Sequence, residues 1–164
     1  MITNDVLRSL RYSLQLSATK IRNLMKGEGY ETTAETVTSW LSKEDEADFR
    51  ECPDAALMAF LDGLITHFRG PAPESAAKPP IKEGFSNNLV LRKIRIALQL
   101  KDDDIINILS AAQLRISKPE LSALFRQKDH KNYRICGDQF LRNFLKGLAR
   151  VKRPNTQTDK KPNH

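Results

Sequence analysis

Apolar side chains recur along this chain at intervals of three and four positions, the spacing that places them on one face of an α-helix. In the first part of the chain the pattern predicts helices over 4–14 and 18–26, a third from residue 34 and a fourth after residue 54. The positions predicted to face the core there are Val6, Leu7, Leu10, Leu14, Ile21, Leu24, Met25, Val37, Trp40, Leu41, Leu57, Phe60, Leu61 and Leu64.

The same pattern is then repeated. When the sequence is shifted by 84 positions without gaps, Asn88–Leu148 aligns with Asn4–Leu64, and Phe60–Leu64 aligns with Phe144–Leu148. Self-similarity at a fixed offset is typical of two copies of one structural unit. A unit of roughly 65 residues is marginally stable alone, so we expect the copies to pack on each other or on a second chain.

The expected fold is therefore all-α: two tandem homologous four-helix units joined by a Pro/Ala-rich linker, with a disordered C-terminal tail. The first unit spans residues 1–70 and the linker 71–87. The second unit spans 88–153 and the tail 154–164.

Polar residues suited to capping precede several of the predicted helices. Ser17 stands before the second helix, and Ser117 with Glu120 three residues later forms a capping box in the second copy. Asp54 and Asp138 are the N-cap candidates of the fourth helix in each copy. In the connection before that helix, an aromatic residue (Phe49 or Tyr133) is expected to anchor the loop.

Gly63 and Gly147 lie inside the predicted fourth helices. A glycine inside a helix costs about 1 kcal/mol relative to alanine. A close crossing with another helix is the expected reason for keeping it.

Charge separates the two copies. The chain carries a net charge of +7, but residues 1–70 hold 8 basic and 11 acidic residues, whereas residues 88–153 hold 15 and 6. The fourth helix of the second copy and the residues after it form a basic stripe of Arg142, Lys146, Arg150, Lys152 and Arg153. Such a stripe suits a phosphate backbone, and a solvated face is the alternative interpretation.

A second stripe is polar and occurs in both first helices: Asn4, Arg8, Arg11, Gln15, Asn88, Arg92, Arg95 and Gln99. One hypothesis is a binding face used twice. The other is structural, with the arginines paired to acids of their own copy, such as Asp45 or Asp54, and the amides capping loops.

The signals for catalysis and metal binding are weak. Two cysteines, Cys52 and Cys136, occupy equivalent positions before a helix and are expected to be buried free thiols. The alternative is a redox role, with the thiol pKa lowered by the helix N-terminus. No zinc-ligand spacing, phosphate loop or nucleophile motif is present, so we expect no metal, no cofactor and no enzyme. The turn between the second and third helices is too long for an ordinary helix-turn-helix.

Short motifs carry a resemblance to a known family: Met1-Ile2-Thr3-Asn4-Asp5, Gly29-Tyr30, Trp40-Leu41 with Lys43-Glu44-Asp45, and Phe60-Leu61-Asp62-Gly63-Leu64. Together with the tandem halves, they resemble the YehS-like family of small bacterial proteins, built from two copies of domain of unknown function 1456. The resemblance implies a two-repeat cytosolic protein and supplies no activity, cofactor or site residue.

The expected function is a non-enzymatic cytosolic binding module whose basic second copy contacts RNA or DNA. The alternative is a protein–protein adaptor or homo-oligomer, in which the basic face meets an acidic protein. No apolar run approaches the roughly 18 residues that a membrane span needs, so no membrane partner is expected.

Overall fold

The computed structural model describes residues 2–70 and 84–154, and within them the chain is all-α. The helices are α1 (Ile2–Leu14), α2 (Ala18–Gly27), α3 (Ala34–Leu41), α4 (Asp54–Arg69), α5 (Asn87–Leu98), α6 (Asp102–Ala111), α7 (Lys118–Leu124) and α8 (Asp138–Lys152). Each predicted helix is present, and the two tandem four-helix units are confirmed. The predicted linker (71–87) and tail (154–164) lie outside the described residues except for 84–87 and 154.

Two of the four predicted N-caps are confirmed. The hydroxyl of Ser17 accepts a hydrogen bond from the Lys20 N–H (3.0 Å), and Ser117 forms the predicted capping box with Glu120. The N-cap predictions for Asp54 and Asp138 are wrong by one residue. Pro53 and Gly137 are the N-caps, and each aspartate is the first helical residue, where its charge suits the positive end of the helix dipole.

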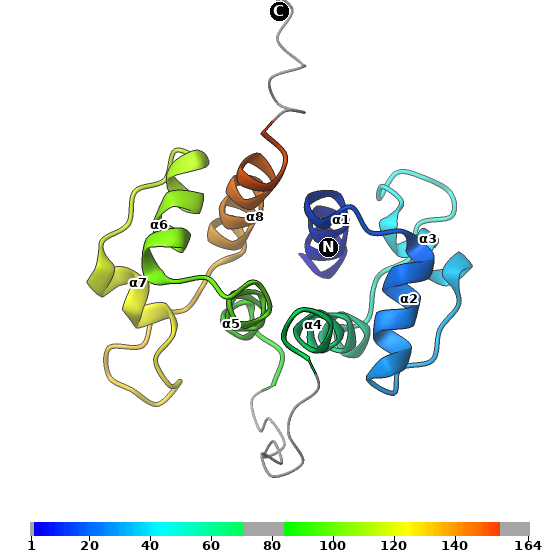
Figure 1. Ribbon diagram of the computed structural model, residues 1–164, viewed down its shortest axis with the longest axis horizontal. Helices are drawn as coiled ribbons and strands as arrows, with labels where there is room; N and C mark the ends of the chain where they lie inside the picture. The colour runs from blue at the N-terminus through cyan, green and yellow to red at the C-terminus, as the bar shows by residue number, and fades with distance from the viewer. Residues whose placement is uncertain (1, 71–83, 155–164) are drawn as a thin grey trace, which may run out of the picture.

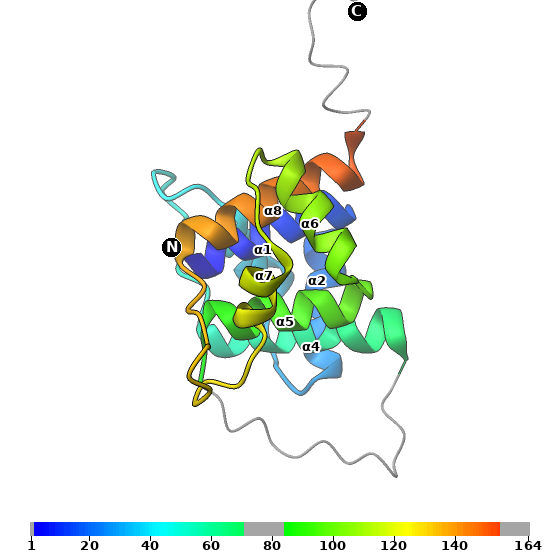
Figure 2. The same ribbon diagram turned by 90° about the vertical axis from the view of Figure 1, so that its left-hand side faces the viewer.

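The two repeats are related by an approximate two-fold axis that runs along the line of sight in Figure 1. Helices α1 and α8 pack together above the axis, and α4 and α5 pack together below it. The pairs α2/α3 and α6/α7 flank this central group on opposite sides. Figure 2 shows the same arrangement from the side, with α1 and α8 above α4 and α5. Since both central pairs join helices of different repeats, the copies pack on each other.

The hydrophobic core is continuous across both repeats. The predicted inward positions are buried, and only those nearest the helix ends, such as Leu14 and Leu41, remain partly accessible. The largest fully buried side chains are Phe60 and its repeat equivalent Phe144. The shared core explains how two small units form one stable structure.

The helix–helix crossing expected at the internal glycines is confirmed in both repeats. A methyl group at Gly63 would lie 2.5 Å from the backbone oxygen of Leu24, where α4 crosses α2. At Gly147, a methyl group would overlap the backbone oxygen of Ile108, where α8 crosses α6. Backbone atoms cannot move aside as a flexible side chain can, so only glycine fits at these two positions.

Polar contacts link the repeats along both central helix pairs. On α1/α8, Arg142 binds the Asp5 carboxylate through Nε (3.1 Å) and Nη2 (3.0 Å). On α4/α5, the Nζ of Lys93 lies 2.5 Å from Oδ1 of Asp62. These contacts join residues of different repeats.

Candidate functional site

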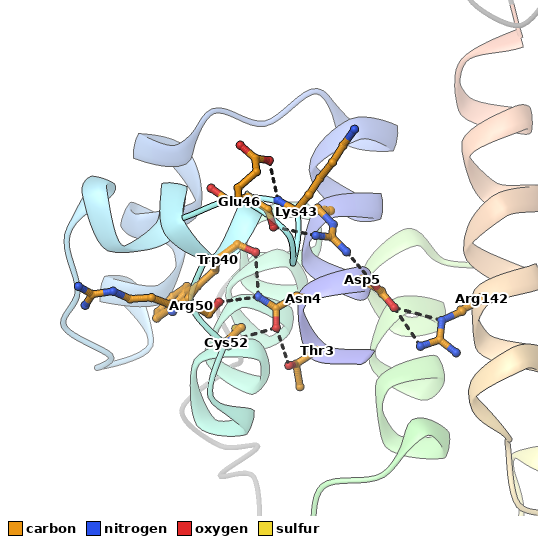
Figure 3. Close-up of polar contacts among 11 residues, drawn as sticks. Thr3, Asn4, Asp5, Trp40, Lys43, Glu46, Arg50, Cys52 and Arg142 are labelled. Carbon is orange, nitrogen blue, oxygen red and sulfur yellow. Dashed lines mark hydrogen bonds and ion pairs between the residues drawn. The ribbon is translucent and has the colours of Figure 1, made fainter. Parts of the chain in front are cut away.

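The retained asparagines of the polar stripe are buried structural groups. The Asn4 side chain donates to the carbonyl oxygens of Trp40 (2.9 Å) and Arg50 (2.8 Å) and accepts from the Cys52 N–H (3.1 Å), as Figure 3 shows. Asn4 is completely inaccessible to solvent. Three bonds from one amide therefore attach α1 to both ends of the loop between α3 and α4.

Asn88 repeats this arrangement in the second unit. It donates to Leu124 O (3.0 Å) and Arg134 O (2.8 Å) and accepts from Cys136 N–H (2.9 Å). Phe49 and Tyr133, the aromatic residues expected to anchor this loop, are partly buried. An amide satisfies irregular backbone groups that an aromatic ring cannot.

The arginines of the polar stripe differ between the copies. Arg8 pairs with Asp5 (2.5 Å) and also donates to the Ser42 carbonyl (2.8 Å). Arg95 pairs with Asp102 (2.7 Å) and lies over the Phe125 ring. Both pair with an acid of their own repeat, although with different acids from the expected ones.

Arg11 and Arg92 complete the set of arginines. Arg11 is exposed, and its guanidinium has no hydrogen bond or ion pair within the described residues. Arg92 lines a shallow depression with Phe125 and the polar side chains of Gln127, Lys128 and Asp129.

The glutamines of the stripe act through their backbone. Gln15 and Gln99 follow the last residues of α1 and α5, and both adopt φ of 55°. The next N–H groups, of Leu16 and Leu100, bond back to the carbonyls of Arg11 and Arg95. This is a helix-terminating turn in the left-handed region, and both side chains point to solvent.

The predicted basic stripe lies on α8 and just beyond it. Three of its five members hold intramolecular contacts. Arg142 binds Asp5, and Arg150 donates to the Ala111 carbonyl at the end of α6 (2.6 Å). The Cζ of Arg153 lies 4.3 Å from the centroid of the Tyr12 ring. Lys146 and Lys152 are exposed, and their ammonium groups bond to no other residue of the described ranges.

Sequence reasoning missed Lys93, which is 4% exposed and is the one buried charged residue among the described positions. Its partner Asp62 stands out in the sequence only as part of a repeated motif. A signal is nevertheless present. Position 62 is acidic in the first copy, and its equivalent, Lys146, is basic. A charge reversal between copies indicates a contact that differs between them.

The cysteines are buried free thiols within the described structure, as expected. Burial, with a smaller contribution from the carboxylate of Asp54, raises the pKa of the Cys52 thiol to about 12. Burial, reinforced by Asp138, raises the pKa of the Cys136 thiol to about 12 as well. A thiol at neutral pH is a poor nucleophile when its thiolate is disfavoured to this degree.

Acidic residues do not gather into a metal-binding arrangement in the described parts of the chain. The aspartates of the Asp102–Asp104 run open α6, and Asp104 accepts from the Lys101 N–H (2.8 Å). Nor does any helix of residues 2–70 or 84–154 have the length and apolar character needed to cross a membrane.

Comparisons with known proteins agree with the two-repeat architecture. The family model described as "Protein of unknown function (DUF1456)" matches residues 3–70 and 87–153. The chain is also 48% identical over 149 residues to "Uncharacterized protein YehS" of Escherichia coli (strain K12), covering 91% of this chain and 95% of that protein. No solved structure matches the chain. The resemblance inferred from the motifs is confirmed.

Proposed function

This chain belongs to the DUF1456 family, and from that premise we propose that it is a non-enzymatic binding module that contacts the phosphate backbone of RNA or DNA through α8. The proposed compartment is the cytosol, in keeping with two buried free cysteines.

The observation that carries the proposal is the difference between two equivalent helices. In α8 the basic residues are Arg142, Lys146, Arg150 and Lys152, and the equivalent α4 residues are Met58, Asp62, Thr66 and Phe68. Arg153, just beyond α8, corresponds to another arginine, Arg69. Both helices bury the same apolar positions of the repeat, and Lys146 and Lys152 are exposed without a partner among the described residues. Packing therefore does not require these two lysines, and a function of the second repeat is the simplest reason for placing them on α8.

The intramolecular contacts of the arginines are compatible with phosphate binding. A guanidinium carries five N–H donors, and Arg150 uses one of them for the Ala111 carbonyl. Holding the side chain in place reduces the entropy lost when phosphate binds. Asp5 offsets the charge of Arg142, so the field favourable to phosphate is expected to be strongest toward Lys146 and Lys152.

The test is a gel-shift titration with single-stranded RNA and duplex DNA in a salt series. The informative variant is Lys146→Gln/Lys152→Gln, since neither side chain has a partner among the described residues whose loss would perturb folding. The matched control, Lys26→Gln/Lys43→Gln, removes the same charge from exposed positions of the first repeat.

Binding through α8 should weaken steeply with salt. In the α8 variant the salt slope on duplex DNA should fall by about 0.9 for each phosphate that the protein no longer neutralises, and the control should behave as the wild type. Absence of binding near physiological salt, or an equal effect of the control, would refute the proposal.

A protein adaptor is the second candidate, and exposed apolar residues favour it. Phe68 of α4 and Ile96 of α5 are 45% and 44% exposed, on the helix pair opposite α1/α8. Contact through apolar surface depends little on salt, so binding of a protein partner that persists in high salt would favour this candidate.

A further inference from the structure

The two central helix pairs are equivalent surfaces that the chain uses twice. The two-fold axis exchanges α1 with α5 and α8 with α4, so the α1/α8 contact corresponds to the α4/α5 contact. Each repeat therefore presents one surface, and the two surfaces are related as in a symmetric dimer. The apolar pattern is nearly the same in both, so it does not by itself say which repeat should pair with which.

The charged residues at these contacts do distinguish the repeats. Lys93 of α5 faces Asp62 of α4, with side chains 5% and 31% exposed. At the equivalent place on the other pair, position 93 becomes Ser9 and position 62 becomes Lys146. The ion pair thus occurs once, and it needs a second-repeat α5 against a first-repeat α4.

Pairing of two second repeats in the same geometry would place Lys93 of one against Lys146 of the other, twice. Leaving a buried charge without its partner is strongly destabilising, and a like charge opposite it adds repulsion. Two first repeats would avoid this clash, but Asp62 would meet Ser9 and the ion pair would be lost.

Two further contacts also form only between a first and a second repeat. Asp5 and Arg142 pair across α1/α8, whereas their equivalents are Leu89 and Met58. A self-paired second repeat would therefore set Leu89 against Arg142. Arg153 stacks on the Tyr12 ring and donates to its carbonyl (3.3 Å), and Tyr12 is replaced by Ile96 in the second copy.

We propose that Lys93 and Asp62, supported by Arg142 and Asp5, specify pairing between unlike repeats. A second repeat therefore pairs with a first repeat, which belongs either to the same chain or to a second copy of this chain. The segment between the repeats joins the two partners, which keeps their effective concentration high and favours the partner within the same chain.

The first test is a charge exchange in the full chain, measured by thermal unfolding. Asp62→Lys and Lys93→Glu should each lower Tm by about 10 °C, from the size of a broken buried pair and the length of the chain. The double variant should recover most of that loss, because opposite charges again face each other. Asp48→Lys, at an exposed loop position, is the control for net charge and should leave Tm nearly unchanged.

The second test measures partner choice directly. The two single variants are unfolded, mixed and refolded, and the mass of the product is determined by light scattering. Exchange of second repeats between the chains places Asp62 against Lys93 once and the two substituted charges against each other once. A two-chain complex with a Tm above that of either single variant is therefore expected. Each variant refolded alone should not form it.

Three results would overturn the proposal. One is additive loss of Tm in the double variant. Another is a refolded mixture that stays monomeric with the low Tm of its components. Because a single variant can fail to fold, the pair is also co-expressed: a soluble two-chain complex supports the proposal, and two insoluble chains refute it.

Discussion

Replacing Asn4 by aspartate tests whether one buried amide anchors the α3–α4 loop. The substitution preserves shape but removes the NH₂ group that donates to the Trp40 and Arg50 carbonyls. Each buried polar group left without its partner costs about 1–3 kcal/mol, so the two carbonyls alone should cost the loop about 4 kcal/mol. The carboxylate, which loses its hydration at this buried position, adds to that loss. The bond from the Cys52 N–H can persist, since a carboxylate also accepts.

The assay uses the thiol that each repeat carries beside this asparagine. Cys52 is 1% exposed and Cys136 is 2% exposed, so alkylation of either reports opening of its own loop. A loss of about 4 kcal/mol corresponds to roughly a thousandfold faster labelling, at tenfold for each 1.4 kcal/mol. In Asn4→Asp the increase should be confined to Cys52, and in Asn88→Asp it should be confined to Cys136.

The matched control is Asn23→Asp, an exposed position on α2, which should label at the wild-type rate. Labelling of Cys52 that rises less than tenfold would refute the importance of the asparagine bonds. An equal rise at Cys52 and Cys136 in native buffer would show that Asn4 stabilises the whole fold, which would refute its role as a local anchor.

Two further predictions follow from the core. Gly63→Ala and Gly147→Ala should each lower the free energy of unfolding, measured by urea titration, by about 2 kcal/mol or more, because the added methyl group overlaps the facing backbone. The control is Gly27→Ala, which has open space around it and should be neutral or stabilising. A small effect at Gly147 would contradict the close crossing. Alkaline pH should destabilise the protein, because the thiols of Cys52 and Cys136 have a pKa of about 12 in the folded state and about 9 in the unfolded chain. Their contribution to the free energy of unfolding is therefore complete below pH 9 and falls between pH 9 and 12 by up to about 1.4 kcal/mol per pH unit for each cysteine. An equally steep pH profile in a variant with both cysteines replaced by alanine would contradict this.

Local patterns predicted most of the helical architecture, because helix formation depends on residues three and four positions apart. The core positions and the capping box at Ser117 could be read in this way. The internal repeat showed that Gly63 and Gly147 share one structural reason, although the facing residue was unknown. The predictions were less accurate at helix boundaries, as for Asp54, where a shift of one residue changes a cap into a first-turn acid.

The candidate sites were only partly predictable. Spacing placed the basic residues of α8 on one side, but their neighbours come from other helices: Arg142 meets Asp5 and Arg153 meets Tyr12 across more than 130 positions of sequence. Spacing alone also groups the asparagines with the arginines on one stripe. The burial of the asparagines becomes evident only when the α3–α4 and α7–α8 loops are seen to fold back onto α1 and α5.

The sequence by itself determined that this protein is two copies of a four-helix unit, because hydrophobic periodicity and repetition are properties of the chain alone. Only the tertiary structure decided that α1 packs on α8 and α4 on α5. The apolar pattern is nearly the same in both copies and is compatible with several pairings. The choice lies in contacts such as Lys93 with Asp62, which exist only once the helices are side by side.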